Sequence, residues 1–537
     1  MQLVAYGAQD VYLSGNPQIT FFKVVYRRHT NFSVEPIQQT WNGAADFGRT
    51  VTCNINRNGD LITNMYVAVK LNAKAAGSEW GYVNRLGHSL IETVKIEIGG
   101  SKIDEQYGDW LNIWYELTHK TGQERGYSKM IGDVPELTAV TAAATNAYQM
   151  YIPLQFWFNR NNGLALPLIA LQYHDVRITL KFRDALACVN YSNVAPALNN
   201  LMADSYLLID YVYLDSEERK RFAQASHEYL IEQLQFTGSE SLTAASNKYR
   251  LNFNHPSKYL IWAPHLENYN TRTKWISYAF DNNWNAARDR FAKVLACATA
   301  LGVAVTAGTI SATVGAAPTL GDLVEPTRAS LTANAYALLD KFEVKFVAQN
   351  ANATCQIASS FANLLENAIV TRNDLTMEDL SITAQKLIDL GASAAIINAF
   401  SLSVINYHNY GNFVDGTDNP VVNAKLQLNG HDRFQARDGN YFNFVQPAQH
   451  FSNTPADGIN VYSFALRAED HQPTGTCNFS RIDNATLQVD CGLFNAPKSD
   501  YVGRYIGNNS NSVVNIYTQN YNVLRVMSGM AGTAYSN

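Results

Sequence analysis

Two segments of this chain are related to each other, and this internal duplication restricts the possible folds more than any other feature. VKIEIGGSKIDEQYGDWLN begins at Val94, and AKLQLNGHDRFQARDGNYFN begins at Ala424, an offset of 330. Both alternate apolar and polar residues up to a Gly-Gly or Asn-Gly pair, which is typical of a half-buried strand that enters a tight turn with positive φ. With one extra residue in the later copy, the pairs of matching positions include Gly108 with Gly439 and Asn112 with Asn443.

Two further pairs of segments extend the duplication. CNINRNGDLI at 53–62 aligns without gaps on LNFNHPSKYL at 251–260, with an offset of 198. YIPLQFWF and LALPLIALQYHDVRITLKF, from Tyr151 onward, resemble VYSFALRA and QPTGTCNFSRIDNATLQV, from Val461 onward, and each copy then ends in another strand-like run. About eight short strands per copy is the number expected for a jelly roll. We therefore predict an all-β fold with two eight-stranded jelly-roll β-sandwiches in tandem.

The two offsets predict a long insertion in the second unit. Because they differ by 330 minus 198, or 132, the second copy is longer by that much between the corresponding strands, and we assign the insertion to about 266–420. It contains LTMEDLSITAQKLIDLG, in which Thr376 and Asp379 can cap a helix and Gly391 can end it. Long loops of this kind usually carry function or recognition, so we expect an exposed, partly helical outgrowth.

One part of the insertion, residues 294–321, contains no charged residue over a length sufficient to cross a membrane. It consists mostly of Ala, Thr, Gly and Val, so its transfer into a bilayer is only weakly favourable. We favour a small-residue loop or short strands over a membrane span.

A charged segment, DSEERKRFAQASHEYL, separates the two units. Asp215 followed by Glu218 resembles a capping box, which predicts a short helical connector. The expected organisation is an N-terminal arm at 1–25, a first jelly roll at 26–214, the helical connector at 215–228, and a second jelly roll at 229–537 that contains the insertion.

Composition argues against several functional classes. Charged residues make up 16% of the chain and aromatic residues 12%, a balance that favours β-rich proteins with extensive interfaces. A net charge of -5 and a pI near 6.1 argue against direct nucleic-acid binding. The six cysteines form no CxxC pair and the N-terminus lacks a signal-peptide pattern, so a reduced, intracellular setting is expected.

The stretch LQLNGHDRFQARDG, at 426–439, could be a short catalytic loop. Its twin holds Ser101 and Lys102 at the positions of His431 and Asp432, so a strand and turn without chemistry is favoured. No HExxH, GxxxxGK[ST], GxSxG or GxGxxG motif occurs. We expect no enzymatic activity, no catalytic, cofactor-binding or metal-binding residues, and no cofactor.

Two weaker signals point to other kinds of site. His471 lies near Cys477 and could form part of a metal site, but the segment between them is a predicted turn and no third ligand is near. Asn352, Asn478 and Asn484 each begin an N-x-S/T sequon. The last two lie in strand-like segments where a glycan would clash, which leaves Asn352 as the better candidate.

Six blocks of the sequence carry a resemblance to a known family. They are VAYGAQDVYLSGNPQITFFKVVYRRHTNFS (Val4 to Ser33), LPLIALQYHDV (Leu166 to Val176), LQLNGHDRF (Leu426 to Phe434), INVYSFAL (Ile459 to Leu466), HQPTGTCNFSRIDNATLQ (His471 to Gln488) and the C-terminal NIYTQNYNVLRVMSGMAGTAYSN. In these blocks the chain is similar to the major capsid proteins of nucleocytoplasmic large double-stranded DNA viruses that infect algae and protists. The blocks cover both halves in the family's order, whereas the large insertion departs from the family pattern.

This resemblance implies a double jelly roll whose homotrimers form pseudo-hexagonal capsomers, because two similar units in each of three chains make six similar wedges. The implied partners are neighbouring capsomers, minor capsid and penton proteins, and inner viral membrane proteins reached by the arm before about Tyr26. Direct nucleic-acid binding is not expected. The implied location is the capsid shell of the virion, made and assembled in the host cytoplasm.

Two aromatic blocks could supply core and intersubunit contacts, and core packing alone is an equally good interpretation. They are Phe156, Trp157 and Phe158 in the first unit and Tyr441, Phe442 and Phe444 in the second.

The alternative from another class is a β-sandwich carbohydrate-binding or carbohydrate-active protein. A glycoside hydrolase needs two carboxylates that face one cleft. Asp432, Asp438, Glu469 and Asp470 are the candidates for that role.

Overall fold

The computed structural model describes most of the chain outside the insertion. The described residues are 7–16, 22–24, 26–192, 195–275, 402–412, 416–492 and 511–535, with four short strands at 310–312, 323–324, 348–349 and 355–357. The predicted helix at 376–391, most of the uncharged run and the sequon at Asn352 lie outside these residues. Across the described part of the chain, no helix has the length and hydropathy needed to span a membrane.

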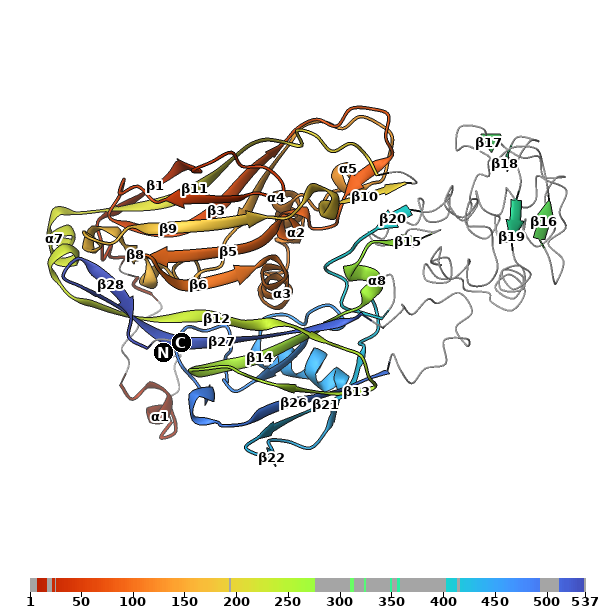
Figure 1. The fold of residues 1–537 in the computed structure, drawn as a ribbon. Helices are drawn as coiled ribbons and strands as arrows, with labels where there is room; N and C mark the ends of the chain where they lie inside the picture. Colours follow the sequence, from red (N-terminus) through yellow and green to blue (C-terminus); the bar gives the residue numbers. More distant parts are fainter. Residues whose placement is uncertain are drawn as a thin grey trace, which may run out of the picture.

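The first half of the chain forms a jelly roll of two antiparallel sheets (Figure 1). One sheet has the strand order β1-β11-β3-β7 and the other has β2-β9-β5-β6. Counted along the chain, the eight long strands are ordered 1-8-3-6 and 2-7-4-5. Their bounds are β1 (Phe32–Thr40), β2 (Thr50–Asn54), β3 (Leu61–Leu71), β5 (Ile91–Ile98), β6 (Ser101–Tyr107), β7 (Tyr148–Pro153), β9 (Val176–Phe182) and β11 (Met202–Leu214).

The second half repeats this strand order. Its sheets are β12-β27-β14-β24 and β13-β26-β21-β22, and β23 also pairs with β21, so β22 and β23 together take the fifth place. The predicted double jelly roll is therefore confirmed. The bounds are β12 (His227–Ser241), β13 (Ser246–Arg250), β14 (Pro256–His265), β21 (Val421–Leu428), β22 (His431–Asp432), β23 (Arg437–Asp438), β24 (Asn460–Ser463), β26 (Ala485–Cys491), β27 (Val513–Met527) and the terminal β28 (Met530–Thr533).

The predicted strand and turn occurs in both barrels at the expected spacing. The strands β5 and β21 are separated by the same sequence offset at both ends, 421 minus 91 and 428 minus 98. The turn residues that follow all have positive φ, which non-glycine residues other than Asn rarely adopt. These angles are 57° at Gly99, 80° at Gly100, 50° at Asn429 and 81° at Gly430.

Each barrel encloses its own hydrophobic core. In β9, buried residues alternate with less buried ones, as expected for a strand with one face on the core. The first core includes Val67, Ile96 and Ile178, and the second includes Leu260 and Leu426. A third buried cluster lies between the barrels and is described below.

The described helices are few and short, and most lie in the connections between strands. Their bounds are α1 (Asp10–Ser14), α2 (Leu86–Leu90), α3 (Gly108–Thr118), α4 (Glu124–Ile131), α5 (Pro135–Thr138), α6 (Trp157–Arg160), α7 (Ser216–Gln224), α8 (Glu267–Asn270), the π-helix η7 (Tyr441–Val445) and α14 (Gln446–His450).

Two details differ from the sequence-based expectations. The connector helix α7 is present and Asp215 is its N-cap residue, but the Asp215 side chain makes no capping hydrogen bond, so the capping box was wrong. The ends of the range assigned to the insertion are packed into the protein, since Leu266 and Val404 are fully buried. These ends form β15 (Thr273–Trp275) and β20 (Leu402–Val404).

Candidate functional site at the seam between the barrels

The contact surface between the two barrels, here called the seam, is built around helix α3 of the first barrel. Gly108 lets α3 start close to the preceding backbone, because a Cβ at this position would lie 2.0 Å from the His88 carbonyl oxygen. Figure 1 shows α3 between its own barrel and the β12-β27-β14 sheet of the second barrel. Its apolar residues Trp110, Ile113, Trp114 and Leu117 are buried in one cluster with residues of the second barrel, among them Tyr259, Ile261, Val461 and Tyr517.

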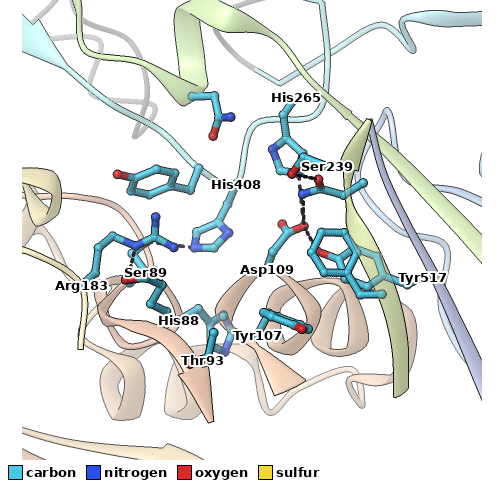
Figure 2. A pocket seen from close by; sticks show the side chains of 16 residues that line it. His88, Ser89, Thr93, Tyr107, Asp109, Arg183, Ser239, His265, His408 and Tyr517 are labelled. Carbon is cyan, nitrogen blue, oxygen red and sulfur yellow. Dashed lines mark hydrogen bonds and ion pairs between the residues drawn. The ribbon is translucent and has the colours of Figure 1, made fainter. Parts of the chain in front are cut away.

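A partly buried carboxylate at the start of α3 binds the second barrel (Figure 2). Asp109 accepts hydrogen bonds from the hydroxyls of Tyr410 (2.7 Å) and Tyr517 (2.7 Å), from Nε2 of His265 (3.1 Å) and from Nδ2 of Asn515 (3.2 Å). Burial opposes ionisation, but the charge of His265 and the hydrogen bonds outweigh it and hold the pKa of Asp109 well below its usual range. One ionised side chain therefore connects α3 to three segments of the other barrel.

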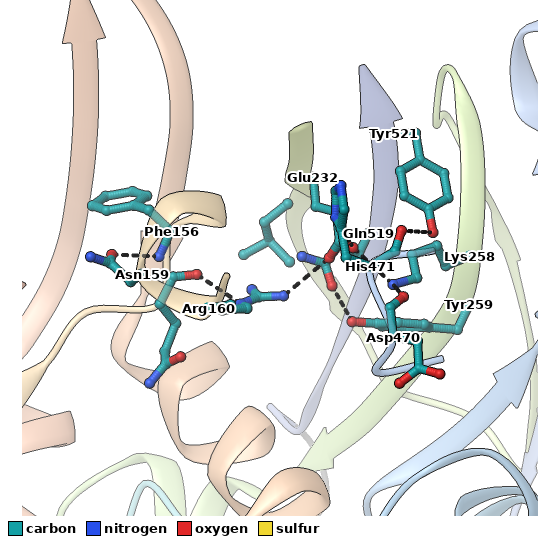
Figure 3. Close-up of polar contacts among 12 residues, drawn as sticks. Phe156, Asn159, Arg160, Glu232, Lys258, Tyr259, Asp470, His471, Gln519 and Tyr521 are labelled. Carbon is teal, nitrogen blue, oxygen red and sulfur yellow. Dashed lines mark hydrogen bonds and ion pairs between the residues drawn. The ribbon is translucent and has the colours of Figure 1, made fainter. Parts of the chain in front are cut away.

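A second buried ionic cluster crosses the seam (Figure 3). Glu232 of β12 lies 2.9 Å from Nζ of Lys258, 3.3 Å from the Arg160 guanidinium and 3.3 Å from Nδ1 of His471. Arg160 ends the first barrel's α6, whereas the other three residues belong to the second barrel. Burial would raise the pKa of Glu232, but the hydrogen bond from His471 and the charges of Lys258 and Arg160 lower it.

The edges of two sheets meet in the seam without forming a ladder. The carboxylate of Asp104, on β6, accepts a hydrogen bond of 3.0 Å from the backbone N–H of Leu234, on the edge strand β12. The side chain of Gln233 donates to the backbone carbonyl of Ile103. Burial raises the pKa of Asp104 to about 7. These contacts satisfy one backbone group on each of the edge strands β12 and β6. Backbone groups on an edge strand are otherwise open to pairing with another strand.

A four-stranded sheet, β15-β20-β10-β4, joins the barrels at the end of the molecule opposite α7 (Figure 1). Its strands β4 (Trp80–Tyr82) and β10 (Val189–Ser192) come from the first barrel, and β15 and β20 come from the second. The side chain of Asn190 also accepts a hydrogen bond of 2.8 Å from the backbone N–H of Ile405. The sheet therefore fixes the two ends of the insertion to both barrels.

The seam also contains a half-open cavity of about 320 Å³ beside Asp109. Figure 2 shows His88, His265 and His408 around it. Burial and the charge of Arg85 lower the pKa of His88 to about 3, and burial also lowers the pKa of His408 well below its usual value. Both imidazoles are therefore neutral at physiological pH. The described residues contain no group of three side chains placed to bind a metal ion.

The structure does not bring the residues of the 426–439 stretch together as a site. His431 and Asp432 are exposed in β22, and Arg437 and Asp438 are exposed in β23. Asp432 accepts a hydrogen bond from the Gln427 side chain at 2.6 Å. The stretch is a strand and turn at the surface.

The other carboxylates proposed for carbohydrate chemistry have separate partners. Glu469 accepts hydrogen bonds from Ser452, and Asp470 lies 3.5 Å from Arg467. His471, the possible metal ligand, instead contacts Glu232.

The aromatic blocks divide between core and surface. Phe156, Trp157 and Phe158 are buried in the first core, and Phe442 is buried in the second. Phe444 is different because it is 38% exposed. Asn478 and Asn484, which we expected to be obstructed, have exposed side chains.

The residues that join the barrels were not identified from the sequence. Asp109 follows a matched glycine, at the place where the second copy has Asn440. Glu232 lies inside the strand-like run LIEQLQF, and Lys258 begins the apolar run KYLIWAP. A charged residue in a strand-like run is the signal that could have revealed them, because strands bury charges only when the charges are paired.

Comparison with known protein families matches the whole architecture. The family model for the major capsid protein N-terminus matches residues 20–215, and the model for the large eukaryotic DNA virus major capsid protein matches residues 218–532. Capsid protein 1 of Acanthamoeba polyphaga mimivirus is 42% identical over 595 residues, covering 100% of this chain and 99% of that protein. The major capsid protein of Paramecium bursaria Chlorella virus 1 is 37% identical over 554 residues, with the same two coverages.

Solved structures show the same likeness. A chain of the PBCV-1 virus capsid has a TM-score of 0.60 and 32% identity, covering 96% of this chain and 100% of that chain. The Faustovirus major capsid protein has a TM-score of 0.58 at 11% identity, covering 97% of this chain and 94% of that chain, which is a likeness of fold.

Proposed function

The chain belongs to the family of major capsid proteins of large eukaryotic DNA viruses, and on this premise we propose that three copies form a capsomer of six barrels. It is a structural protein of the capsid shell. Capsomers with a pseudo-hexagonal outline can tile the flat facets of an icosahedral shell with neighbours on every side. The relatives are capsid proteins, so we propose neither a catalytic nor a carbohydrate-binding role.

One observation carries this proposal: two barrels of identical strand order are held together by buried ionic contacts. Separating the barrels would take Arg160 of the first barrel away from the buried carboxylate of Glu232 in the second, and breaking a buried ion pair in this way is costly. A rigid pair of similar wedges is the unit that a threefold ring needs in order to imitate sixfold geometry.

The native mass of the purified protein tests the trimer. We expect a particle of three times 59.7 kDa by light scattering coupled to size-exclusion chromatography. A particle of 59.7 kDa at the concentrations used for assembly would contradict the proposal.

We also propose the division into an arm (1–25), two barrels (26–214 and 229–537), a connector (215–228) and an insertion (266–420) that faces outward. The insertion either contacts the host surface or shields the junctions between subunits. Assembly is proposed to take place in the host cytoplasm.

The arm is proposed to contact minor capsid, penton or inner-membrane proteins beneath the barrels. Its described part exposes large apolar side chains, including Tyr12 (94% exposed) and Phe22 (98% exposed), which is typical of a segment that binds a partner. Deletion of residues 1–25 should leave trimers intact and impair shell assembly. Loss of the trimer would contradict this role.

A further inference from the structure

The seam inside one chain provides a template for the contact between chains. In the first barrel, the helix after the fifth strand places four apolar residues on the outer face of the neighbouring barrel's sheet. These residues are Trp110, Ile113, Trp114 and Leu117. Their neighbour Leu111 points the other way, into the core of its own barrel.

The second barrel has a helical segment, η7 with α14, in the same place. Gly108 and Gly439 start the two helical segments. Each glycine lies against the first residue of the fourth long strand of its barrel, Ile91 of β5 or Val421 of β21. A Cβ would be 2.3 Å from the Ile91 carbonyl oxygen at Gly108 and 1.8 Å from the Val421 carbonyl oxygen at Gly439. Asn112 and its match Asn443 are both fully buried. In the alignment that pairs these glycines and asparagines, the matches of the four seam residues are Tyr441, Phe444, Val445 and Ala448.

These matching residues form an apolar face, here called the helix face, that the described part of the chain leaves largely open. Phe444 is 38% exposed and Val445 is 42% exposed, and Ala448 is also exposed, whereas Tyr441 is partly buried against the core of its own barrel. Phe442, the match of Leu111, is fully buried in its own core. Like α3, the segment has one side that faces its own core and one that faces away from it. The second barrel covers the outer side of α3, but none of the described elements covers the outer side of this segment.

The first barrel carries the corresponding receiving surface. On the sheet β1-β11-β3-β7, Tyr206, Ala68 and Tyr151 lie opposite one another across three strands, and Leu208, Tyr66 and Pro153 form the next row. Residues directly opposite in antiparallel strands share one face. This face is the outer one, because the alternate residues Val67 and Val69 lie in the core. The six residues, here called the sheet face, include no charged side chain. Tyr151 is 36% exposed, Ala68 is fully buried and the other four are partly buried.

The edge strand of the same sheet, β1, carries exposed apolar side chains. β1 is its outermost described strand, and Phe32 and Val34 on β1 are 55% and 50% exposed. β12, which takes the same place in the second barrel, is covered by β6 within the chain through the Asp104 and Gln233 contacts.

We propose that the helix face of one copy packs on the sheet face of a second copy, and so repeats the seam between chains. This inference rests on the proposed homotrimer and names its interface. A second copy is the fitting occupant because the chain already covers the corresponding sheet of its second barrel with the corresponding helix. Each copy donates one helix face and accepts one, so the contact is head-to-tail, and the threefold rotation of the proposed homotrimer closes it into a ring.

Charge substitutions on the two faces test the pairing. Phe444→Glu and Tyr151→Glu should each weaken the trimer by about 30-fold or more, the loss typical of an interface hot spot. Both residues are partly exposed, so the monomer should keep its fold, as far-UV circular dichroism would verify. Phe444→Glu combined with Tyr151→Lys should recover part of the loss. Leu466→Glu, at a side chain that is 72% exposed outside both faces, is the matched control and should remain trimeric.

The outcomes separate this inference from the trimer proposal. A monomeric wild-type protein overturns both. A trimeric wild type whose Phe444→Glu and Tyr151→Glu variants also remain trimeric overturns the interface alone, as does dissociation of only one variant.

Crosslinking provides a second measurement that does not depend on destabilised variants. Phe444→Cys and Tyr151→Cys proteins, mixed after dissociation and reassembly, should give a crosslinked species of about twice 59.7 kDa with a short bismaleimide. A mixture of Leu466→Cys with Tyr151→Cys is the control and should not crosslink. An equal yield in both mixtures contradicts the interface.

Discussion

The two barrels share one strand order but differ greatly in their connections. Between the third and fourth long strands, the first barrel has residues 72–90, whereas the second has residues 266–420. The strands are constrained because every second residue must fill a core. Connections lie at the surface and tolerate change. The duplication has therefore preserved the barrels and left the connections free to acquire separate roles.

The comparison extends to single residues at the starts of the matching helices. Asp109 is partly buried and binds four partners, whereas its counterpart Asn440 is exposed. The charge occurs only in the copy that has partners to stabilise it. A fully paired charge thus marks the side of the duplication where the chain makes an internal contact.

The largest expected effect comes from breaking the ionic cluster around Glu232, which joins the two barrels at the seam. Glu232→Ala should lower the free energy of unfolding by about 3–5 kcal/mol, because it leaves the buried Lys258 and the partly buried Arg160 without their carboxylate. Denaturant unfolding measures this. Glu228→Ala is the control, since Glu228 and its partner Arg525 are 60% and 54% exposed and their ion pair contributes little. Equal effects of the two substitutions would contradict the importance of the buried cluster.

The next prediction tests whether the matched glycines are equivalent. Gly108→Ala and Gly439→Ala should each cost about 1–3 kcal/mol, because in both cases the new Cβ would collide with a backbone carbonyl oxygen. Gly532→Ala has open space around the added methyl group and should change the unfolding midpoint little. If only one of the two matched variants is destabilised, the structural equivalence of these positions fails.

Unfolding measured as a function of pH tests whether His88, in the first barrel's part of the seam, is buried in its neutral form. The pKa of His88 is about 3 in the folded protein, below its ordinary 6.5, so the unfolded chain takes up the proton more readily. The contribution of neutral His88 is complete above pH 6.5 and is lost as the pH falls toward 3. Between pH 7 and pH 5 the loss is about 2 kcal/mol.

The variant His88→Gln isolates this contribution. Between pH 7 and pH 5 its unfolding free energy should fall by about 2 kcal/mol less than that of the wild type. This holds even if the variant is less stable at pH 7. Comparison with the wild type is needed because Asp104, with a raised pKa of about 7, has the opposite dependence. His431→Gln, at an exposed position, is the matched control. An unchanged slope in His88→Gln would show that this histidine is not a buried neutral group.

The smallest expected effect on the barrels follows from removing the connection in which they differ most. Trp275 and Leu402 are paired neighbours in β15 and β20, so residues 276–401 can be replaced by Asn-Gly without separating the strands. The shortened chain should unfold at the same or a slightly higher denaturant concentration, because loop closure costs less. Loss of soluble protein would show that the barrels depend on the insertion.

The fold was largely predictable from the sequence because the duplication has a local signature. The alternating strands and the Gly-Gly and Asn-Gly turns each depend on a few neighbouring residues. The position of α7 was also predictable, but its capping hydrogen bond was not, since Asp215 has a suitable residue type without the required geometry.

The seam could not be predicted in this way because it depends on contacts between residues far apart in sequence. Asp109 meets Tyr517 from the far end of the chain, and Arg160 meets Glu232 in the other barrel. The packed ends of the insertion were missed for the same reason. β20 pairs with β10, and no local pattern relates Tyr191 to Ser403.

The sheet shared by β4, β10, β20 and β15 has a mechanical consequence. β20 lies between β10 of one barrel and β15 of the other, so a force pulling on the chain before Leu402 acts on hydrogen bonds to both barrels at once. Neither barrel bears that load alone. Strain arriving at the outer end of the molecule is thus distributed through the whole subunit instead of peeling its two halves apart.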